Sequence, residues 1–180
     1  MKNGRVVWIT GLPGSGKSSA AMALRKLCPR LVVLRMDDLR RLVTPNPTYS
    51  EGEREILYRS MVYTAKTLSG LGRDVAIDAT GNLRRWRRLA RKEISPFAEV
   101  YLKCPLPVAI KREEKRQKRL GAPRGVYAKG KKGWPVPGLS APYEEPRAPE
   151  LVIETDRVNI EEAARLINAL LRGLGKNRHA

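Results

Sequence analysis

The chain has 180 residues, enough for one domain with a sizeable core, and its 42% hydrophobic content argues against disorder. The formal net charge of +18 predicts attraction to polyanions such as nucleotides, phosphorylated small molecules or RNA, although an arginine-rich surface with few acids would give the same charge. No apolar run approaches the roughly 20 residues of a membrane span, and the short stretch 6–9 is no signal peptide, so we expect a cytoplasmic protein with no membrane partner.

Apolar runs alternate with amphipathic stretches along the whole chain. We expect strands over 5–10, 31–36, 74–78, 98–104 and 151–154, and helices over 19–27, 50–71, 82–91, 105–120 and 159–173. Unbroken apolar strands fit a parallel sheet that is covered on both faces. The pattern predicts one domain, residues 1–180, with the three-layer α/β/α fold of P-loop NTPases and a five-stranded parallel sheet. Ligands of such folds bind at the carboxyl ends of the strands.

Polar residues mark where several of these helices start. Ser50 with Glu53 and Asn159 with Glu162 have the spacing of a capping box, and Asn82 is the cap expected for the third helix. Residues 121–149 are rich in glycine, proline, lysine and arginine, which excludes a central element there. We expect residues 111–149 to form a basic lid.

Residues 11–18 match the pattern G-x-x-x-x-G-K-[ST] between the first expected strand and the first expected helix. In that context glycines let backbone N–H groups surround phosphate oxygens, and a helix N-terminus favours the negative charge. Lys17 is expected to reach the β- and γ-phosphates as a catalytic residue, and the Ser18 hydroxyl to bind Mg²⁺. The sequence thus predicts a nucleoside triphosphate held by Gly11, Leu12, Pro13, Gly14, Ser15, Gly16, Lys17, Ser18 and Ser19.

Carboxylates follow the second and third expected strands. Phosphoryl transfer to a hydroxyl needs a carboxylate that accepts the proton or holds the Mg²⁺ shell, directly or through water, and Asp37 is the candidate. Arg40 is the candidate anchor for an anionic acceptor, and Asp38 is expected to cap a short helix. Asp78 is either a second carboxylate near the metal or a plain strand-end residue, and Asn82 either binds substrate or caps its helix.

Basic residues gather in two stretches. Arg84, Arg88 and Arg91 share one helix face, which is either solvated or a patch for a polyanion. In the expected lid, the candidates to meet the transferred phosphate are Arg112, Arg116, Arg119 and Arg124, of which Arg112 is assigned to nucleotide binding. Trp134 either stacks on a base or fixes the lid to the core.

The sequence gives little support for a cysteine metal site or for catalysis by a histidine. Cys28 and Cys104 lie far apart, have no metal-ligand spacing and are expected as buried free thiols in a reducing compartment. The single histidine, His179, lies in the C-terminal tail, so neither a Ser-His-Asp nor a Cys-His set is expected.

The order of these motifs resembles the adenylylsulfate kinase family over most of the chain. Besides the phosphate loop, the similar stretches are 37–40, 49–54, 97–106, 125–129 and 138–144, and the last two are the most specific. The resemblance implies an ATP- and Mg²⁺-dependent kinase that phosphorylates the 3′-hydroxyl of adenylylsulfate, a small anionic nucleotide, in sulfate activation. It also implies a homodimer. Together with the strand-end residues and Trp134 singled out above, it gives as the expected acceptor-binding residues Asp37, Arg40, Arg54, Asp78, Asn82, Lys129, Trp134 and Leu139.

Several positions depart from the family pattern, all on the acceptor side. Leu57 stands where the family has asparagine, Gly81 about where it has a phosphorylatable serine, and Val136 where it has a base-stacking aromatic residue. Trp134 is the candidate replacement for that ring. The stretch 78–82 is more similar to kinases of polynucleotide ends or aminoacyl-tRNA. An RNA or nucleoside acceptor and a non-catalytic nucleotide-binding regulator are therefore the alternative functions.

Overall fold

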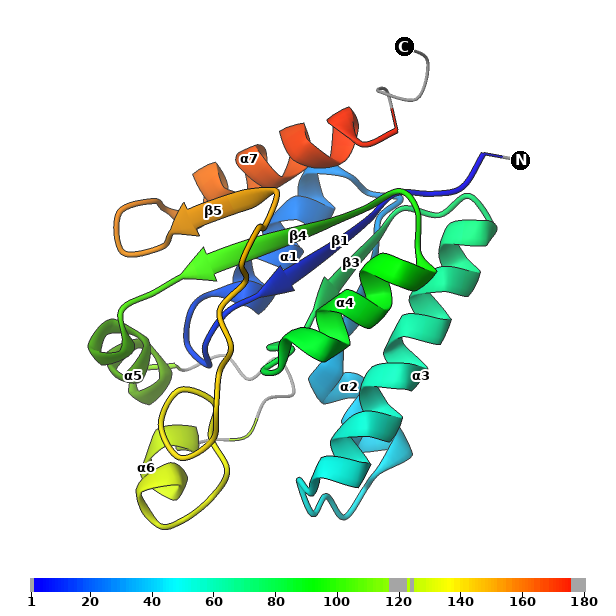
Figure 1. Cartoon of the computed structure of the whole chain (residues 1–180). Helices are drawn as coiled ribbons and strands as arrows, with labels where there is room; N and C mark the ends of the chain where they lie inside the picture. The colour runs from blue at the N-terminus through cyan, green and yellow to red at the C-terminus, as the bar shows by residue number, and fades with distance from the viewer. Residues whose placement is uncertain (1, 117–122, 124, 176–180) are drawn as a thin grey trace.

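Five parallel strands form the centre of the protein, which a computed structural model describes at residues 2–116, 123 and 125–175 (Figure 1). The strands are β1 (Val6–Thr10), β2 (Val32–Arg35), β3 (Val75–Asp78), β4 (Phe97–Lys103) and β5 (Leu151–Glu154), in the spatial order β2-β3-β1-β4-β5. The register places Ile9 of β1 beside Asp78 of β3 and Val100 of β4. The carboxyl ends of the strands therefore meet at one edge of the sheet, as the sequence predicts.

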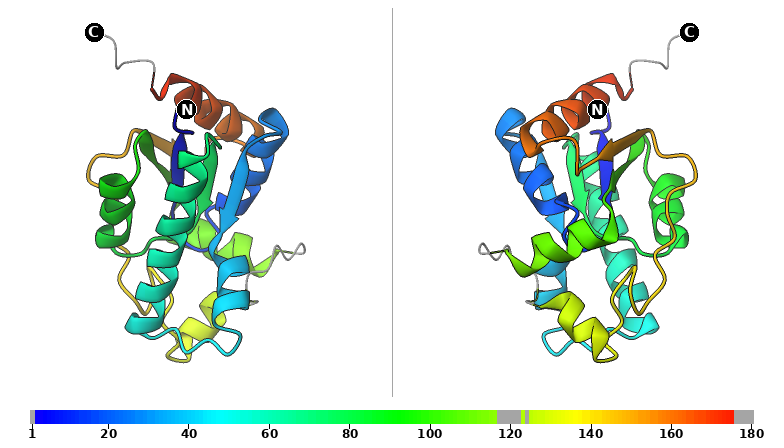
Figure 2. Two further views of the ribbon diagram at one scale, coloured as in Figure 1. Left: turned by 90° about the vertical axis from the view of Figure 1, so that its right-hand side faces the viewer. Right: turned by 90° about the vertical axis from the view of Figure 1, so that its left-hand side faces the viewer.

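Helices cover both faces of the sheet because its strands alternate two sets of apolar side chains. α1 (Lys17–Leu27) and α7 (Ile160–Gly173) pack on the face with Val7 and Ile9. α3 (Glu51–Gly70) and α4 (Arg84–Glu93) pack on the face with Val6 and Trp8. Figure 2 shows α1 and α4 on opposite sides of the sheet. The predicted three-layer α/β/α P-loop NTPase fold is confirmed.

Three shorter helices lie toward the carboxyl edge of the sheet: α2 (Met36–Val43), α5 (Leu106–Glu114) and α6 (Val126–Lys131) (Figure 1). α6 lies inside the stretch from which the sequence excludes a central element, and it is indeed peripheral. Its Tyr127 is buried in a small cluster with Ala109 of α5 and Val136. This cluster packs α5, α6 and the chain after α6 into one unit beside the phosphate loop.

Two predicted helix caps are confirmed. The Ser50 hydroxyl accepts a hydrogen bond from the Glu53 N–H at 3.3 Å, and the Asn159 side chain accepts one from the Glu162 N–H at 2.8 Å. Each bond satisfies an N–H group that the first turn of a helix leaves without a backbone partner.

Two other cap assignments are wrong. α2 begins at Met36, so Asp38 lies inside its first turn and pairs with Arg35 at 3.0 Å instead of capping the helix. α4 begins at Arg84, two residues after Asn82, whose side chain donates to the carbonyl oxygen of Pro142 at 3.3 Å. In both cases the carboxyl or amide group binds a charged side chain or a carbonyl oxygen and not the first N–H groups of its helix, which residue type alone does not indicate.

The chain returns to β5 through residues 142–150, which we call the return segment. Arg87 of α4 is 2% exposed, pairs with Glu99 of β4 and donates to the carbonyl oxygen of Glu144 at 2.5 Å. Arg91 pairs with Glu150 at 2.5 Å. Part of the predicted arginine patch of α4 therefore holds the return segment in place.

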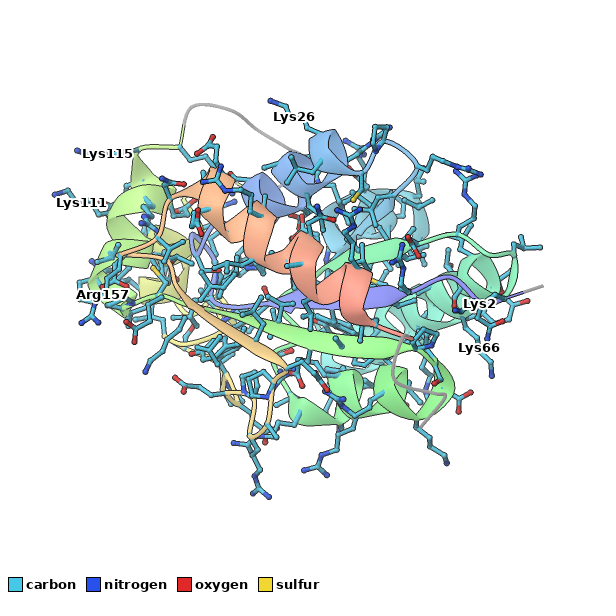
Figure 3. The ribbon with its side chains drawn as sticks, turned by 90° about the horizontal axis from the view of Figure 1, so that it is seen from above. Lys2, Lys26, Lys66, Lys111, Lys115 and Arg157 are labelled. Atoms are coloured by element: carbon cyan, nitrogen blue, oxygen red, sulfur yellow. The ribbon has the colours of Figure 1, made fainter. Side chains whose placement is uncertain are left out.

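Many of the basic side chains lie on the surface. Lys26, Lys66, Lys111 and Lys115 point away from the ribbon in Figure 3. Both cysteines are free, and Cys104 is buried whereas Cys28 is half-buried. Across the described part of the chain, no helix combines the length and the apolar character needed to span a membrane.

Candidate active site

A cavity of about 770 Å³ opens at the carboxyl edge of the sheet, where the fold predicts the ligand. The phosphate loop, α2, the start of α3, α5 and the chain after β5 all contribute to its wall. The sequence-predicted residues that line it are Pro13, Gly14, Ser15, Gly16, Lys17, Ser18, Ser19, Asp37, Arg40, Arg54, Asp78, Arg112, Arg116 and Trp134.

The phosphate loop has the backbone that its glycines predict. Gly14 and Gly16 have φ angles of 80° and 97°, in the left-handed region that side chains disfavour. A Cβ on Gly14 would lie 2.2 Å from the carbonyl oxygen of Ala109, so α5 packs directly on the loop. α1 starts at Lys17 with no side-chain cap and no acidic residue in its first turn. Its first N–H groups are therefore available to an anion.

The Lys17 side chain folds back over the loop that precedes it. Its Nζ donates to the carbonyl oxygens of Gly11 at 2.9 Å and Leu12 at 2.8 Å. Burial lowers the pKa of Lys17 below its ordinary value, and the carboxylates of Asp78 and Asp37 act in the opposite direction. Gly11 and Leu12 thus serve the site through their carbonyl groups, and they do not line the cavity.

Asp37 and Asp78 reach the cavity from different elements. Asp37 lies in the first turn of α2, and Asp78 is the last residue of β3. Burial raises the pKa of Asp37 above its ordinary value, and the charge of Asp78 raises it further against the effect of Lys17. The two carboxylates and the ammonium therefore influence one another at the same end of the cavity.

Oxygen groups of this kind fit Mg²⁺, a hard cation that binds few protein ligands and keeps phosphate oxygens and waters. Ser18, Asp37 and Asp78 all line the cavity. Over the described residues, no group of three or more His, Cys, Asp or Glu side chains could hold a metal by itself. The residues present therefore suit a metal that arrives with a nucleotide.

Another part of the cavity wall alternates cations and aromatic rings. The guanidinium carbon of Arg40 lies 4.5 Å from the centre of the Tyr49 ring, which lies 4.5 Å from that of Trp134. Arg40 also pairs with Glu53. Arg54 donates to the carbonyl oxygens of Tyr49 at 3.1 Å and Pro135 at 2.9 Å, which joins α3 to the chain after α6.

Two of the predicted lid arginines can be compared directly. Arg112 donates to the carbonyl oxygen of Thr155 at 2.6 Å and to its hydroxyl at 3.1 Å. Arg116 lines the cavity and donates to the carbonyl oxygen of Pro123 at 2.7 Å. Arg119 and Arg124 lie outside the described residues.

Three predicted acceptor-binding residues do not line the cavity. Asn82 is buried, and Leu139 is 41% exposed at the surface. Lys129 reaches the site indirectly, because its ammonium lies 4.7 Å from the centre of the Trp134 ring. Their roles in acceptor binding stay predictions.

The cavity also contains residues that the sequence did not single out. Tyr58 is 4% exposed and accepts a hydrogen bond from the Gly81 N–H at 3.0 Å, and Thr155 and Glu113 come from the chain after β5 and from α5. The helix period of α3 could have placed Tyr58 on the buried face. Glu113 lies in a strongly charged helix, where no pattern distinguishes a buried carboxylate from a solvated one.

Comparisons with known proteins agree with this geometry. The sequence model of the family described as adenylylsulphate kinase matches residues 3–154. A probable adenylyl-sulfate kinase of Archaeoglobus fulgidus is 40% identical over 158 residues, which cover 84% of this chain and 96% of that protein. A probable adenylyl-sulfate kinase of Pyrococcus abyssi is 34% identical over 178 residues, which cover 96% of this chain and 97% of that protein.

A solved structure of an APS kinase is similar to this chain in both sequence and fold. The APS kinase CysC of Mycobacterium tuberculosis, in complex with AMPPNP and APS, is 32% identical and superposes with a TM-score of 0.81. The match covers 96% of this chain and 99% of that chain. The resemblance predicted from the motifs is confirmed, and the chain belongs to the adenylylsulphate kinase family.

Proposed function

We propose that this kinase transfers the γ-phosphoryl group of ATP to the 3′-hydroxyl of adenylylsulfate, which gives ADP and 3′-phosphoadenylylsulfate. The observation on which the proposal rests is one continuous cavity, in a chain of this family. There the phosphate loop faces Asp37 and the wall formed by Arg40, Tyr49 and Trp134. That arrangement would bring a triphosphate and a second nucleotide to the same carboxylate.

The phosphate loop is the part that we assign to ATP. The uncapped N–H groups at the start of α1 and the loop N–H groups would bind the phosphate oxygens. Lys17 would exchange its carbonyl partners for oxygens of the β- and γ-phosphates, because an ion pair with phosphate replaces two neutral hydrogen bonds. Arg112 borders the same half of the cavity beside Thr155, and we keep it as a nucleotide-binding residue.

Mg²⁺ is the cofactor that we propose for the transfer. When bound, the ion neutralises the charge that develops on the phosphate oxygens. Ser18 would hold it through its hydroxyl, and Asp37 directly or through water. Asp78 would add a second carboxylate from β3.

Asp37 has a second task at the acceptor. It lines the cavity together with Lys17, whose charge acts on it, and a carboxylate there can accept a proton from a hydroxyl. We propose that it receives the proton of the attacking 3′-hydroxyl. Arg40 and Arg54 would bind the anionic sulfate or phosphate of the acceptor, and Tyr49 and Trp134 would contact its base.

A coupled assay of ADP release tests the proposal. We expect ADP to form with ATP, Mg²⁺ and adenylylsulfate, and the Lys17→Ala variant to lose the activity by orders of magnitude, since it lacks the cation at the transferring phosphate. An RNA oligonucleotide with a free 5′-hydroxyl and a panel of nucleosides serve as alternative acceptors. ADP formed with one of these and none with adenylylsulfate would contradict the acceptor that we propose. ATP binding with no transfer to any acceptor would indicate a regulator.

Three further parts of the prediction remain proposals. The chain is expected to act as a single domain, in the cytoplasm and as a homodimer, because the resemblance to the family implies a dimer and the two free thiols fit a reducing compartment. Light scattering of the purified protein measures its mass directly. A mass of one chain at assay concentration would contradict the dimer.

A further inference from the structure

Glu113 is a buried carboxylate in the wall of the cavity. Its side chain is 1% exposed, and neither of its carboxylate oxygens has a hydrogen-bond partner within the described structure. It lines the cavity that the phosphate loop borders. A buried charge without hydrogen bonds is destabilising, so its presence needs a reason beyond the fold.

The position of Glu113 follows from how α5 packs. Ala109 of α5 approaches the phosphate loop so closely that Gly14 has no room for a Cβ. Glu113 lies four residues after Ala109, on the same helix face. Lys111 of α5 and Lys115, which follows the helix, point outward in Figure 3. The inner face of α5 therefore presents Glu113 toward the site of the triphosphate.

The cation next to Glu113 is Arg116. The guanidinium of Arg116 lies 3.6 Å from the Glu113 carboxylate, and its side chain is 30% exposed and lines the same cavity. The positive charge of Arg116 acts to lower the pKa of Lys17, so the two cations repel each other electrostatically. Two neighbouring cations that face a cavity repel each other unless an anion lies between them.

The competing arginine has another task. Arg112 makes two hydrogen bonds to Thr155, at 2.6 and 3.1 Å, and so holds the chain that follows β5. To reach a phosphate it would have to leave both. Arg116 would have to leave only one hydrogen bond, to the carbonyl oxygen of Pro123 at 2.7 Å, and it keeps Glu113 as an acidic partner in the cavity wall.

We propose that Arg116 is the arginine that contacts the γ-phosphoryl group during transfer, and that Glu113 is the positioning residue that aims its guanidinium there. The inference rests on the proposed kinase activity and adds two roles to it. Glu113 acts through Arg116 and does not touch the substrate. Its carboxylate fixes the direction of the planar guanidinium before ATP binds. The guanidinium is then already oriented toward the γ-phosphoryl group, and less entropy is lost in the transition state.

Two kinds of measurement test the pair. Kinetics with ATP and adenylylsulfate should show Arg116→Ala lowering kcat by on the order of 1000-fold and Glu113→Gln by about tenfold or more, with little change in KM for adenylylsulfate. Calorimetry with AMPPNP and with ADP needs no acceptor, and it should show both variants losing their preference for the triphosphate while ADP affinity is kept. Arg116→Lys should recover part of the lost rate.

Matched controls lie at the C-terminal end of the same helix, at its last residue and at the residue that follows it. Glu114→Gln and Lys115→Ala alter exposed residues beside the pair and should leave kcat and both affinities unchanged. The double variant Glu113→Gln/Arg116→Ala should be no slower than Arg116→Ala alone, because one residue acts through the other.

Other outcomes overturn the inference. Additive losses in the double variant would show that Glu113 acts independently of Arg116. Unchanged nucleotide discrimination in Arg116→Ala would remove that residue from the phosphate. If Glu113→Gln unfolds, the preference of Arg116→Ala and Arg116→Lys for AMPPNP over ADP still decides whether Arg116 contacts the γ-phosphate. If the wild type transfers nothing to adenylylsulfate yet prefers AMPPNP over ADP through Arg116, the proposed acceptor fails and the arginine assignment stands.

Discussion

The Nε of Arg35 lies 3.5 Å from the carboxylate of Asp78, across the neighbouring strands β2 and β3. Both side chains are nearly buried, with 12% and 5% of their surface exposed. Arg35 thus offsets part of the charge that Asp78 and Asp37 bring to the cavity. A site with two carboxylates and one structural cation remains able to attract Mg²⁺ without repelling the triphosphate strongly.

Asp78→Asn should weaken the response of the enzyme to Mg²⁺. We expect the Mg²⁺ concentration for half-maximal activity to rise about tenfold, as for residues that act on a metal through its water shell. Asp37→Asn should lower kcat as well, since it removes the proton acceptor. A titration of activity against MgCl₂ measures both effects. Asp38→Asn, whose carboxylate pairs with Arg35 and Arg41 outside the cavity, is the control, and an equal shift in that variant would contradict the assignment.

Trp134 should report acceptor binding by fluorescence. Trp8 and Trp86 are 0% and 4% exposed in the core, whereas Trp134 lines the cavity against Tyr49. Adenylylsulfate should therefore change the emission of Trp134 alone, and Trp134→Phe should abolish the change. Because stacking of a base on an aromatic ring contributes about 1–3 kcal/mol, Trp134→Ala should raise KM for adenylylsulfate by about tenfold. Unchanged emission at saturating substrate would place the base elsewhere.

The buried pair of Arg87 and Glu99 should be important for stability. Arg87→Met leaves the carboxylate of Glu99 with only Arg91, 3.7 Å away, and we expect the free energy of unfolding to fall by about 3 kcal/mol. Urea denaturation measures the change. Arg88→Met, one residue further on the exposed side of α4, should change it by less than about 0.5 kcal/mol. Adding Glu99→Leu to Arg87→Met should recover part of the loss, and a double variant as unstable as the single one would argue against the ion pair.

Acid should weaken the contact between Arg5 and Asp74, which joins the start of β1 to β3. Burial opposes ionisation of Asp74, but hydrogen bonds from the Arg5 side chain and N–H bring its pKa below the ordinary 3.8. A carboxylate with a depressed pKa stabilises the fold above its unfolded pKa, and that contribution is lost as pH falls through the folded value. The difference in unfolding free energy between wild type and Asp74→Asn should shrink below pH about 4. A difference that stays constant across this range would exclude the linkage.

Much of the site is predictable because it depends on backbone requirements. The glycines of the phosphate loop predict left-handed backbone φ angles. The apolar runs predict the strands at whose carboxyl ends Asp37 and Asp78 lie. The sheet edge follows from the βα alternation alone. The fold, the phosphate loop and the family were therefore within reach of the sequence.

The interaction partners of individual side chains could not be predicted from the sequence. The sequence predicts Asp38 as a helix cap and leaves Asn82 between a cap and a substrate contact. Their partners are instead Arg35 and Arg41 for Asp38 and the carbonyl oxygen of Pro142 for Asn82, which depend on where neighbouring elements end. In the sequence, Glu113 cannot be distinguished from an exposed glutamate. Only the packing of Ala109 against the phosphate loop shows that this face of α5 is buried. Tertiary packing decides such cases, and a single sequence records packing only through residue type.

The Tyr127 hydroxyl of α6 donates a hydrogen bond to the carbonyl oxygen of Pro13 at 2.7 Å. This bond ties the helix next to Trp134 to the loop that would receive ATP. Displacement of α6 by an incoming acceptor must either break the bond or move the loop backbone with it. An acceptor that moved α6 would thereby act on the phosphate loop, and such a connection favours an ordered sequence of substrate binding.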